Sequence, residues 1–399
     1  MGVHALDGIK VLDLSRVLAG PWCAQTLADL GADVWKVEAP GTGDDTRTWM
    51  PPEIGGESTY YLCANRSKRS IAVDFRTAAG QEIVRRFARE ADVVVENFRH
   101  GALERYGLDH ASLAALNPRL IYCSISGYGR TGSRATEPGY DFAIQAESGL
   151  MSITGDPDGE PMKLGVAIAD VATGMNAVQA ILAALFARER SGEGQFIDMS
   201  LLDSAVSLLA NVASGHLATG GAPGRFGNAH ATVAPYQIFP SADGSFALAV
   251  GNDRQFAILC GKVIGRPELA EDPRFLTNRK RVDNREALIP ILREHFMTRP
   301  TAHWIAALKA AGVPSGQVRT VPEVFAAPEI AERGLTAEVA DKRHGTLRLM
   351  RSPLQLRGTP TRAPSAPPRL GEHTDELLRE VLGASADEIA EWRRNGAVA

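Results

Sequence analysis

The sequence has no excess of basic charge, because 43 lysines and arginines face 47 aspartates and glutamates, for a formal net charge of −4. Proteins that bind nucleic acid electrostatically carry a basic face or stripe, so we expect no nucleic-acid partner. The first residues, MGVHALDG, lack the apolar core of a signal peptide. We also find no uncharged run approaching the roughly 18 apolar residues of a membrane helix. These absences predict a soluble, cytoplasmic protein with no membrane partner.

Cysteine is scarce as well. The four cysteines, Cys23, Cys63, Cys123 and Cys260, lie far apart and form no C-x-x-C pair. This spacing excludes a dense disulfide framework and the usual zinc-binding motifs. We therefore expect reduced, structural thiols and no metal site.

The first third of the chain alternates short β-branched runs with amphipathic stretches. Ile9 to Leu14 and Asp33 to Val37 have the composition of strands, and Cys23 to Leu30 between them is typical of a helix. Such alternation predicts an α/β fold with a parallel sheet covered by helices. Further along, a long helix is predicted over Thr173 to Arg190, followed by a strand over Gln195 to Met199.

The composition changes to Gly, Ala, Pro and Arg around residues 219–228, which indicates a domain boundary. We expect residues 1–220 to form the first part of a large domain and residues 228–326 to form a small α+β domain. The small domain begins with a predicted β-hairpin that turns at Ser241 to Gly244. Residues 327–399 are expected to return to the large domain, through a proline-rich connector and a final pair of helices.

The strand, loop, helix and strand that end at Glu38 have the layout of a dinucleotide site. However, the loop Ser15 to Gly20 reads SRVLAG, without the G-x-G-x-x-G that lets the backbone approach a pyrophosphate. The layout thus predicts a fold and does not predict NAD binding.

Asp170 follows a short apolar run and precedes the small residues that open the long helix. A carboxylate at a helix N-terminus is stabilised by the dipole, and free N–H groups there can hold a developing oxyanion. Aspartate is also a favoured N-cap, which would explain Asp170 without catalysis. The residues alone leave both interpretations open.

Seven stretches spread along nearly the whole chain carry a further signal: LDGIKVLDLSRVLAGP, DLGADVWKVEAPGTGD, SKRSIAVD, ADVVVENFRHGALERYGL, NPRLIYCSISGYG, SGEGQFIDMSLLD and LGEHTDELL. In this order they resemble the class III CoA-transferases, a group that includes formyl-CoA:oxalate, carnitine and bile-acid CoA-transferases and the related α-methylacyl-CoA racemase. Two more stretches, DDTRTWMPPEIGGESTYYL and GNAHATVAPYQIF, resemble the succinyl-CoA:glutarate branch.

The resemblance implies a Rossmann-like large domain, with a parallel sheet built from both chain ends, in an interlocked homodimer. It implies that Asp170 is the catalytic nucleophile. The positions that match CoA contacts are Val17, Leu18, Ala19, Val73, Arg76, Asn97, Phe98 and Arg105. Ala39 stands where the family has a basic contact, so we expect Lys68, Arg76 or Arg105 to carry more of the phosphate binding. CoA would be a substrate and product, with no permanently bound cofactor.

The resemblance also implies CoA transfer from succinyl-CoA to glutarate or another C4 to C6 dicarboxylate, such as itaconate, mesaconate or malate. The steps would pass through a mixed anhydride and an aspartyl-CoA thioester. Arg47 is our candidate for binding the distal carboxylate, because a guanidinium can donate two hydrogen bonds to it; a solvated loop charge is the alternative. Tyr140 matches a tyrosine beside the acyl site. His230 is either a substrate contact or a structural histidine. The glycine run of the formyl transferase is missing here, which favours a different acid.

Two other functions have to be weighed. A racemase needs a second acid–base group, a histidine in that relative, and Tyr140 stands at the matching position. With an unperturbed pKa of about 10, a tyrosine is poorly suited to take a proton at neutral pH. A CoA-binding protein without catalysis would be expected to lose the aspartate, and Asp170 is present.

Overall fold

The computed structural model describes residues 3–399, which form two compact units. The first unit consists of the chain up to Leu150, Lys163–Ser214 and Glu329–Ala399. The second consists of Met151–Met162 and Gly215–Pro328. The division differs from the predicted domains in three places. Residues 151–162, 215–220 and 327–328 belong to the second unit, although we expected them in the large domain.

A six-stranded parallel sheet lies at the centre of the first unit. Its strands, in spatial order, are β5 (Arg69–Ala72), β2 (Asp33–Glu38), β1 (Lys10–Asp13), β6 (Val93–Glu96), β7 (Ile121–Ser126) and β8 (Gln195–Ser200). Numbered along the chain this order is 3-2-1-4-5-6, the doubly wound arrangement of dinucleotide-binding folds. The predicted α/β fold with a parallel sheet is confirmed.

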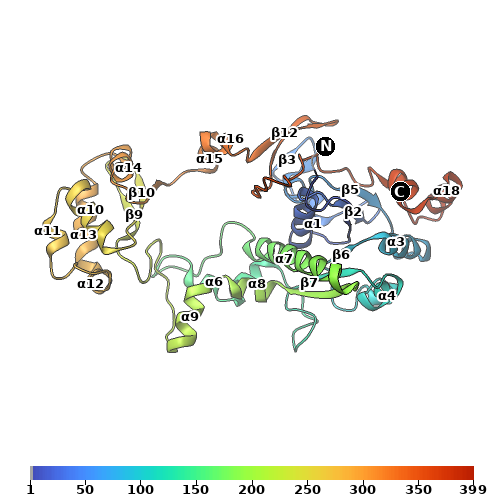
Figure 1. Cartoon of the computed structure of the whole chain (residues 1–399), viewed down its shortest axis with the longest axis horizontal. Coiled ribbons are helices and arrows are strands. Elements are labelled where there is room, and N and C mark those ends of the chain that lie inside the picture. Colours follow the sequence, from blue (N-terminus) through green and yellow to red (C-terminus); the bar gives the residue numbers. More distant parts are fainter. Residues whose placement is uncertain (1–2) are drawn as a thin grey trace. The chain divides into compact units, whose positions relative to one another are not determined.

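The predicted contribution of both chain ends to the sheet is wrong, because all six strands come from the first half of the chain. The C-terminal end adds two helices, α17 (Thr374–Leu382) and α18 (Ala386–Arg394), which appear in red in Figure 1. Among residues 3–399, the one β-bridge that this end makes to the sheet region is the isolated bridge from Val398 to Val73. The C-terminus therefore covers the sheet and does not extend it.

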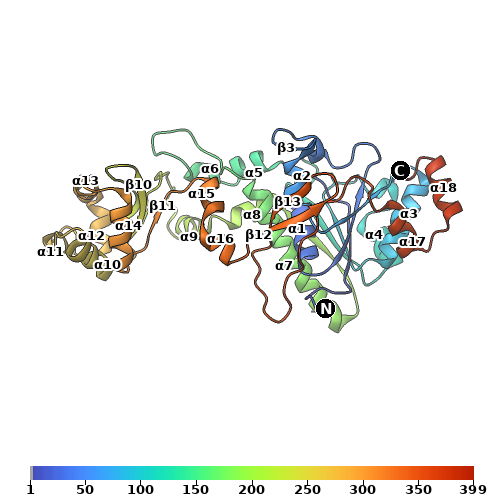
Figure 2. The same ribbon diagram turned by 90° about the horizontal axis from the view of Figure 1, so that it is seen from above.

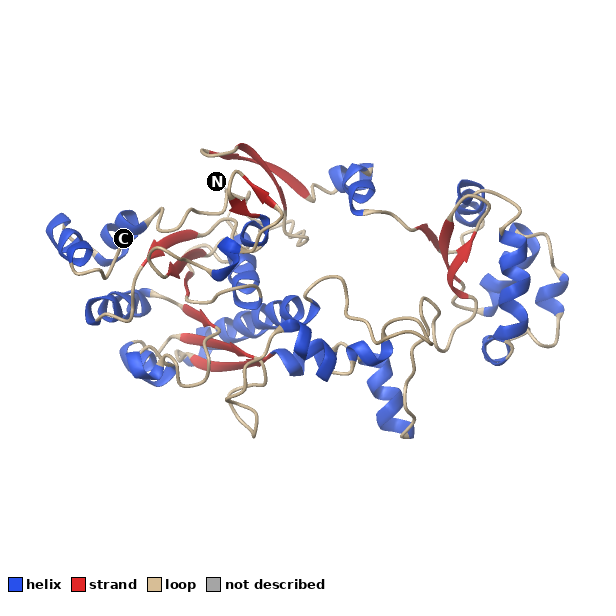
Figure 3. Ribbon diagram, turned by 180° about the vertical axis from the view of Figure 1, so that it is seen from behind, coloured by secondary structure: helices blue, strands red, loops and turns tan. Residues whose placement is uncertain are grey.

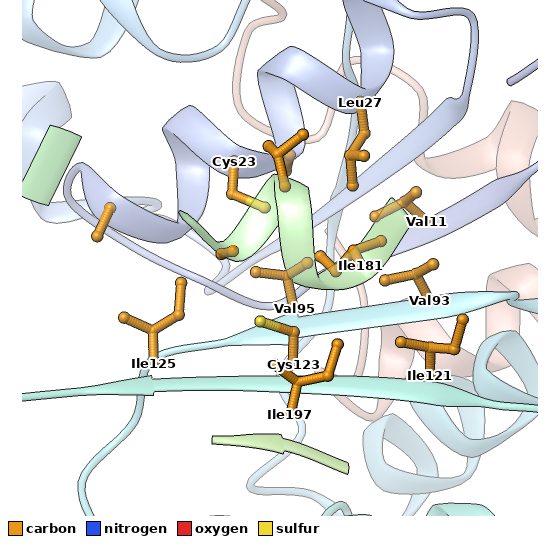
Figure 4. Close-up of a cluster of buried hydrophobic side chains, with 14 of the residues drawn as sticks. Val11, Cys23, Leu27, Val93, Val95, Ile121, Cys123, Ile125, Ile181 and Ile197 are labelled. Atoms are coloured by element: carbon orange, nitrogen blue, oxygen red, sulfur yellow. The ribbon is translucent and has the colours of Figure 1, made fainter. Parts of the chain in front are cut away.

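Helices cover both faces of the sheet, as Figure 2 shows edge-on. One face packs against α1 (Ala19–Asp29) and α7 (Ile168–Ser191). The other packs against α3 (Ala78–Glu90), α4 (His110–Leu116), α17 and α18. Alternate side chains of a strand point to opposite faces, so the two cores are filled by alternating residues of the same strands. In Figure 4, Val93 and Val95 of β6 meet Cys23 of α1 and Ile181 of α7.

Helix α7 is long and apolar enough to match a membrane span by length and composition, contrary to the expectation from the sequence. The bent pair α8 (Leu201–Ser207) and α9 (Ala210–Thr219) meets the same criteria only if both helices count as one span. Half of the most apolar 18-residue stretch of α7 is buried inside the protein, and a buried helix is expected to be apolar. Its other face leaves Met175, Leu182 and Phe186 exposed.

Shorter elements complete the first unit and lie near the loops that follow the strands. They are η1 (Asp45–Thr48), β3 (Glu53–Ile54), β4 (Glu57–Ser58), α2 (Thr59–Cys63), η2 (Glu104–Tyr106), α5 (Asp141–Glu147), β12 (Thr336–Asp341) and β13 (Gly345–Met350). Two short helices, α6 (Leu150–Ile153) and α16 (Pro328–Glu332), fall where the chain passes from one unit to the other.

The second unit contains a three-stranded antiparallel sheet in the order β11 (Ser315–Gln317), β10 (Ser245–Ala249), β9 (Tyr236–Pro240). Strands β9 and β10 form the hairpin that the sequence predicts. Figure 3 shows these short strands together with the helices of this unit: α10 (Asp253–Ile258), η3 (Leu259–Val263), α11 (Glu268–Glu271), α12 (Asn278–Asp283), α13 (Arg285–Phe296), α14 (Thr301–Ala310) and α15 (Val321–Ala326). A separate apolar core holds this unit together.

Candidate active site

A cavity of about 150 Å³ opens at the carboxyl ends of the central strands. It lies where the strand order reverses, between β1 and β6, and ligands of doubly wound folds bind at this point. Its walls are the loops after β1, β6 and β7, the first turn of α7 and the start of α8. Among the lining residues are Val17, Leu18, Ala19, Asn97, Phe98, Arg99, His100, Ser126, Tyr140 and Asp170.

Asp170 is the third residue of α7 and lines this cavity. The N-cap of α7 is Ala167, without a side-chain cap of its own, so the N-cap interpretation of Asp170 is wrong. Within residues 3–399, no hydrogen bond to the Asp170 carboxylate is present. Burial, and then the charge of Asp141, raise the pKa of Asp170 to about 7. The side chain is thus a carboxylate without a hydrogen-bond partner in the described chain, and its pKa is shifted towards neutrality.

Asp141, the first residue of α5, caps α7 from outside the helix. Its Oδ1 accepts hydrogen bonds from the N–H groups of Ala169, at 2.8 Å, and Asp170, at 3.4 Å. Its Oδ2 accepts one from Nε2 of Gln145 at 2.7 Å, and Oε1 of Gln145 accepts one from the N–H of Leu164 at 2.9 Å. This network fixes the segment that leads into α7. No motif in the sequence singled out Asp141, although it directly follows Tyr140.

A second residue that the sequence analysis missed is Tyr60 of α2. Burial, and then the charges of Asp170 and Cys63, raise the pKa of Tyr60 to about 12, so its hydroxyl stays a neutral donor. Its ring packs edge-on against Trp49, with the centroids 5.0 Å apart. Both aromatic residues lie within the stretch that resembles the glutarate branch.

The loop after β1 is held in an unusual conformation. Val17 has φ = +69°, which is rare for a β-branched residue. Its N–H donates to Oδ1 of the buried Asp44 at 3.2 Å. Nζ of Lys36 donates to Oδ2 of Asp44 and to the carbonyl oxygen of Ser15, both at 2.9 Å. Although burial opposes ionisation, Lys36 and the hydrogen bonds from Thr46 lower the pKa of Asp44 to about 2.

Most of the predicted CoA contacts lie at this cavity. Val17, Leu18, Ala19, Asn97 and Phe98 line it together with Tyr140 and Asp170. Arg105 lies in an adjoining pocket of about 460 Å³, which shares Arg16, Phe98, Arg99 and His100 with the first.

The guanidinium of Arg16 lies 5.1 Å from the centre of the Phe98 ring. No motif in the sequence singled out Arg16, Arg99 and His100. The positive charges of the two arginines in these walls suit a polyanionic ligand.

Three other predicted contacts are placed differently. Lys68 is fully buried, with Nζ donating to Asp13, the Pro21 carbonyl and Asn65 at 2.8 to 3.0 Å, so it cannot reach a phosphate. Burial lowers the pKa of Lys68 to about 8. The side chain of Val73 is in the core, which leaves only its backbone for a ligand. Arg76 is exposed and paired with Asp74.

The structure does not support the prediction that Arg47 binds a distal carboxylate. Its Nε and Nη2 donate to both carboxylate oxygens of Glu38 at 2.8 and 2.7 Å. Nη2 also donates to the Tyr61 hydroxyl at 2.6 Å and the Pro368 carbonyl at 3.1 Å. Nε and Nη2 of Arg47 are thus occupied within the protein, and the largely buried side chain is not a solvated charge. The acid that would hold a ribose in a dinucleotide site here holds an arginine.

His230 belongs to the second unit. There its ring packs against Tyr236, with the centroids 5.2 Å apart, and its Nδ1 accepts a hydrogen bond from the N–H of Thr232 at 3.1 Å. A role as a substrate contact stays a prediction.

Comparison with known proteins decides the family. A model of CoA-transferase family III matches residues 6–374. The chain belongs to CoA-transferase family III. This confirms the resemblance and shows that the cavity belongs to a CoA-transferase.

Two relatives and one solved structure show how close the similarity is. A succinate–glutarate CoA-transferase of Agrobacterium fabrum is 47% identical over 382 residues, 94% of this chain and 95% of that protein. A succinyl-CoA:glutarate CoA-transferase of Homo sapiens is 42% identical over 396 residues, 99% of this chain and 90% of that protein. The crystal structure of a CAIB/BAIF family protein from Brucella suis is 48% identical, with a TM-score of 0.85, and the match covers 95% of this chain and 100% of that one.

Proposed function

We propose that this CoA-transferase moves CoA from succinyl-CoA to glutarate or a related C4 to C6 dicarboxylate, with Asp170 as the nucleophile. The observation that carries the proposal is the Asp170 carboxylate, which lines the cavity between the loops of the switch point and accepts no hydrogen bond from residues 3–399. The two relatives, a succinate–glutarate and a succinyl-CoA:glutarate CoA-transferase, support succinyl-CoA and glutarate as the substrates.

In the proposed reaction, a carboxylate oxygen of Asp170 attacks the thioester carbonyl of succinyl-CoA. The thioester bond breaks, which leaves an aspartyl–succinyl anhydride and CoA thiolate. The thiolate attacks the aspartyl carbonyl, which releases succinate and forms an aspartyl-CoA thioester. The acceptor carboxylate then repeats the two steps in reverse. Each step conserves an activated acyl group, so one difficult exchange becomes several easier ones.

Two features of the site favour this chemistry. The partly buried position of Asp170 limits the access of water, which would hydrolyse the anhydride and the thioester. A carboxylate without hydrogen bonds is also a better nucleophile than a fully solvated one, because no donor has to be removed before the attack. Arg16, Arg99 and Arg105 line the adjoining pocket, where they are available for the phosphates of CoA.

We further propose that two copies of the chain form an interlocked homodimer. The exposed face of α7 carries Met175, Leu182 and Phe186, which are 54%, 36% and 67% exposed. A row of exposed apolar side chains on one long helix favours an interface in which the same apolar face of a second copy covers it.

The assay incubates the enzyme with succinyl-CoA and one acid from a panel of glutarate, itaconate, mesaconate, malate and oxalate, and detects new CoA esters by mass spectrometry. We expect the glutarate ester to form fastest. Hydroxylamine added during turnover should modify the peptide that contains Asp170. The D170N variant, which keeps the shape but not the nucleophile, should lose at least about a thousand-fold in rate.

The alternatives give other results. Exchange of the α-proton of an acyl-CoA with deuterium from solvent, without a new ester, would favour the racemase function. CoA binding without either reaction would favour a non-catalytic protein. Unmodified Asp170 under turnover would refute its role as a nucleophile.

A further inference from the structure

Ser126 ends strand β7 and lines the same cavity as Asp170. Its Oγ is buried and has no hydrogen-bond partner among residues 3–399, a state shared only with Nε of Arg188 in that part of the chain. Buried hydroxyl groups in proteins are nearly always hydrogen-bonded, and the exceptions call for an explanation. A ligand in the cavity would supply the missing partner.

Ser124, two residues earlier on the same strand, has a side-chain hydroxyl with hydrogen-bond partners. Its Oγ donates to Glu96 and accepts a hydrogen bond from Nε of Arg130. The side chains of Ser124 and Ser126 share one face of the sheet, because strand residues two apart point to the same side. Arg130 thus hydrogen-bonds the hydroxyl of Ser124, whereas the hydroxyl of Ser126 has no hydrogen-bond partner in the described chain.

The direction of Ser126 indicates which part of a ligand it meets. Ile125 packs into the core beneath α1 and α7, so Ser126 points to the opposite face of the sheet. On that side the cavity wall is the loop after β6, with Asn97, Phe98 and Arg99. The first turn of α7, which carries Asp170, belongs to the other face. Ser126 is therefore placed for the arm of an acyl-CoA and not for its reacting carbonyl.

We propose that the Ser126 hydroxyl hydrogen-bonds an amide group of the pantetheine arm of CoA. The inference rests on the proposed function in one respect, that the ligand of this cavity is a CoA thioester. The arm contains secondary amides, each with one donor and one acceptor. A serine hydroxyl can both donate and accept, so it can pair with either end of such an amide.

The experiment measures CoA binding to the intact protein by calorimetry and by the shift of Tm. In S126A we expect the affinity for CoA to fall roughly 3- to 10-fold, the value of one net hydrogen bond. The Tm of the free protein should stay the same or rise, because the variant removes a hydroxyl that has no partner. For succinyl-CoA, KM should rise and kcat should stay close to that of the wild type.

Ser70 provides the matched control. Its hydroxyl is also buried, but it donates to Glu38 and accepts from the N–H of Gly371, at 2.7 and 2.9 Å. The S70A variant should lower the Tm and leave the affinity for CoA unchanged. It separates the loss of a structural hydroxyl from the loss of a ligand contact.

A second comparison uses the succinyl thioester of a simple alkanethiol, which has no amides. S126A and the wild type should use this substrate equally well. An equal loss on both thioesters would overturn the proposal, because Ser126 would then act at the reacting carbonyl. Equal CoA affinities of S126A and the wild type would also overturn it. A wild type that binds CoA but transfers none would refute only the proposed function.

Discussion

At the scale of single residues, two carboxylates, Asp141 and Asp170, lie at the start of α7 and differ in their hydrogen bonds. Asp141 accepts hydrogen bonds from the N–H groups of Ala169 and Asp170, whereas no hydrogen bond to the Asp170 carboxylate is found in residues 3–399. The charge of Asp141 adds to burial in disfavouring a second charge nearby, and the pKa of Asp170 rises from 3.8 to about 7. Because only the ionised carboxylate attacks a thioester, the rate should fall as the pH decreases through about 7.

The variant D141N tests this coupling. Asparagine keeps an oxygen for the N–H of Ala169 and removes the negative charge, so the pKa of Asp170 should fall. We expect the acid limb of the kcat/KM profile for succinyl-CoA to move to lower pH.

Asp109 provides a control, because it caps α4 by accepting from the N–H of Ser112 and does not line the Asp170 cavity. D109N should leave the acid limb of the kcat/KM profile at the same pH as in the wild type. An unchanged limb in D141N would show that burial alone sets the pKa of Asp170.

Arg47 provides a second prediction at this scale. Its partner Glu38 is almost fully buried, so the variant R47A would leave an uncompensated charge and should destabilise the fold by about 3 to 5 kcal/mol. Urea unfolding measures this loss.

If Arg47 instead bound the acceptor acid, R47A would raise only the KM for glutarate. The exposed Arg76, paired with Asp74, is the control, and R76A should leave the free energy of unfolding almost unchanged.

At the scale of elements, the loop between β1 and α1 depends on a buried polar network. Asp44 accepts from the N–H of Val17 and from Lys36, and Lys36 also holds the carbonyl of Ser15. The left-handed conformation of Val17 costs free energy, so it persists only because the surrounding structure determines it. The network thus shapes the wall of the cavity from beneath.

The variant D44A tests the network. It leaves the buried Lys36 ammonium without its carboxylate and the N–H of Val17 without its acceptor. We expect a loss of about 3 to 5 kcal/mol in the free energy of unfolding, measured in urea, and weaker CoA binding.

The neighbouring Asp45 is the control, because its ion pair with Arg16 at 3.2 Å is about half exposed. D45N should cost less than about 1 kcal/mol. A small loss in D44A, comparable to that in D45N, would contradict the role of the network.

At the scale of the whole molecule, the chain leaves the first unit twice and returns to it twice, so neither unit is a continuous segment. One side of helix α7 packs against α1 and the sheet in the core of the large unit. The other side of the helix is exposed. That exposed side is where we expect the second copy of the chain.

The variant F186D tests the homodimer. Phe186 is 67% exposed, and a charge placed there would have to be desolvated in a dimer that buries this face. We expect the mass in solution, measured by light scattering, to shift from dimer towards monomer.

The control is E189Q, which changes an exposed side chain paired with Arg119 at 3.8 Å. It should keep the mass of the wild type. A wild type that is monomeric at micromolar concentration would refute the homodimer.

Local patterns in the sequence were sufficient for the sheet, the hairpin of β9 and β10 and the existence of the long helix, although α7 begins at Ile168, five residues before the predicted Thr173. The reason is that strand and helix periodicity depends on neighbours a few residues apart. The predicted boundary near residue 220 rests on a local change of composition, and the chain divides six residues earlier, after Ser214. The same patterns could not place residues 151–162 in the second unit or keep the C-terminal end out of the sheet, because those outcomes depend on contacts between distant segments.

The motifs of the sequence by themselves determined the family and pointed to Asp170. Only the tertiary structure decided what surrounds Asp170 and which charges are free. Arg47 is held by Glu38 and Pro368, Lys68 by Asp13, and the start of α7 by Asp141. The partner of a buried charge is chosen by the fold, since desolvation makes an unpaired charge too costly wherever the chain places it. For that reason a charge in a motif can be a ligand contact or a structural ion pair, and its sequence alone does not tell which.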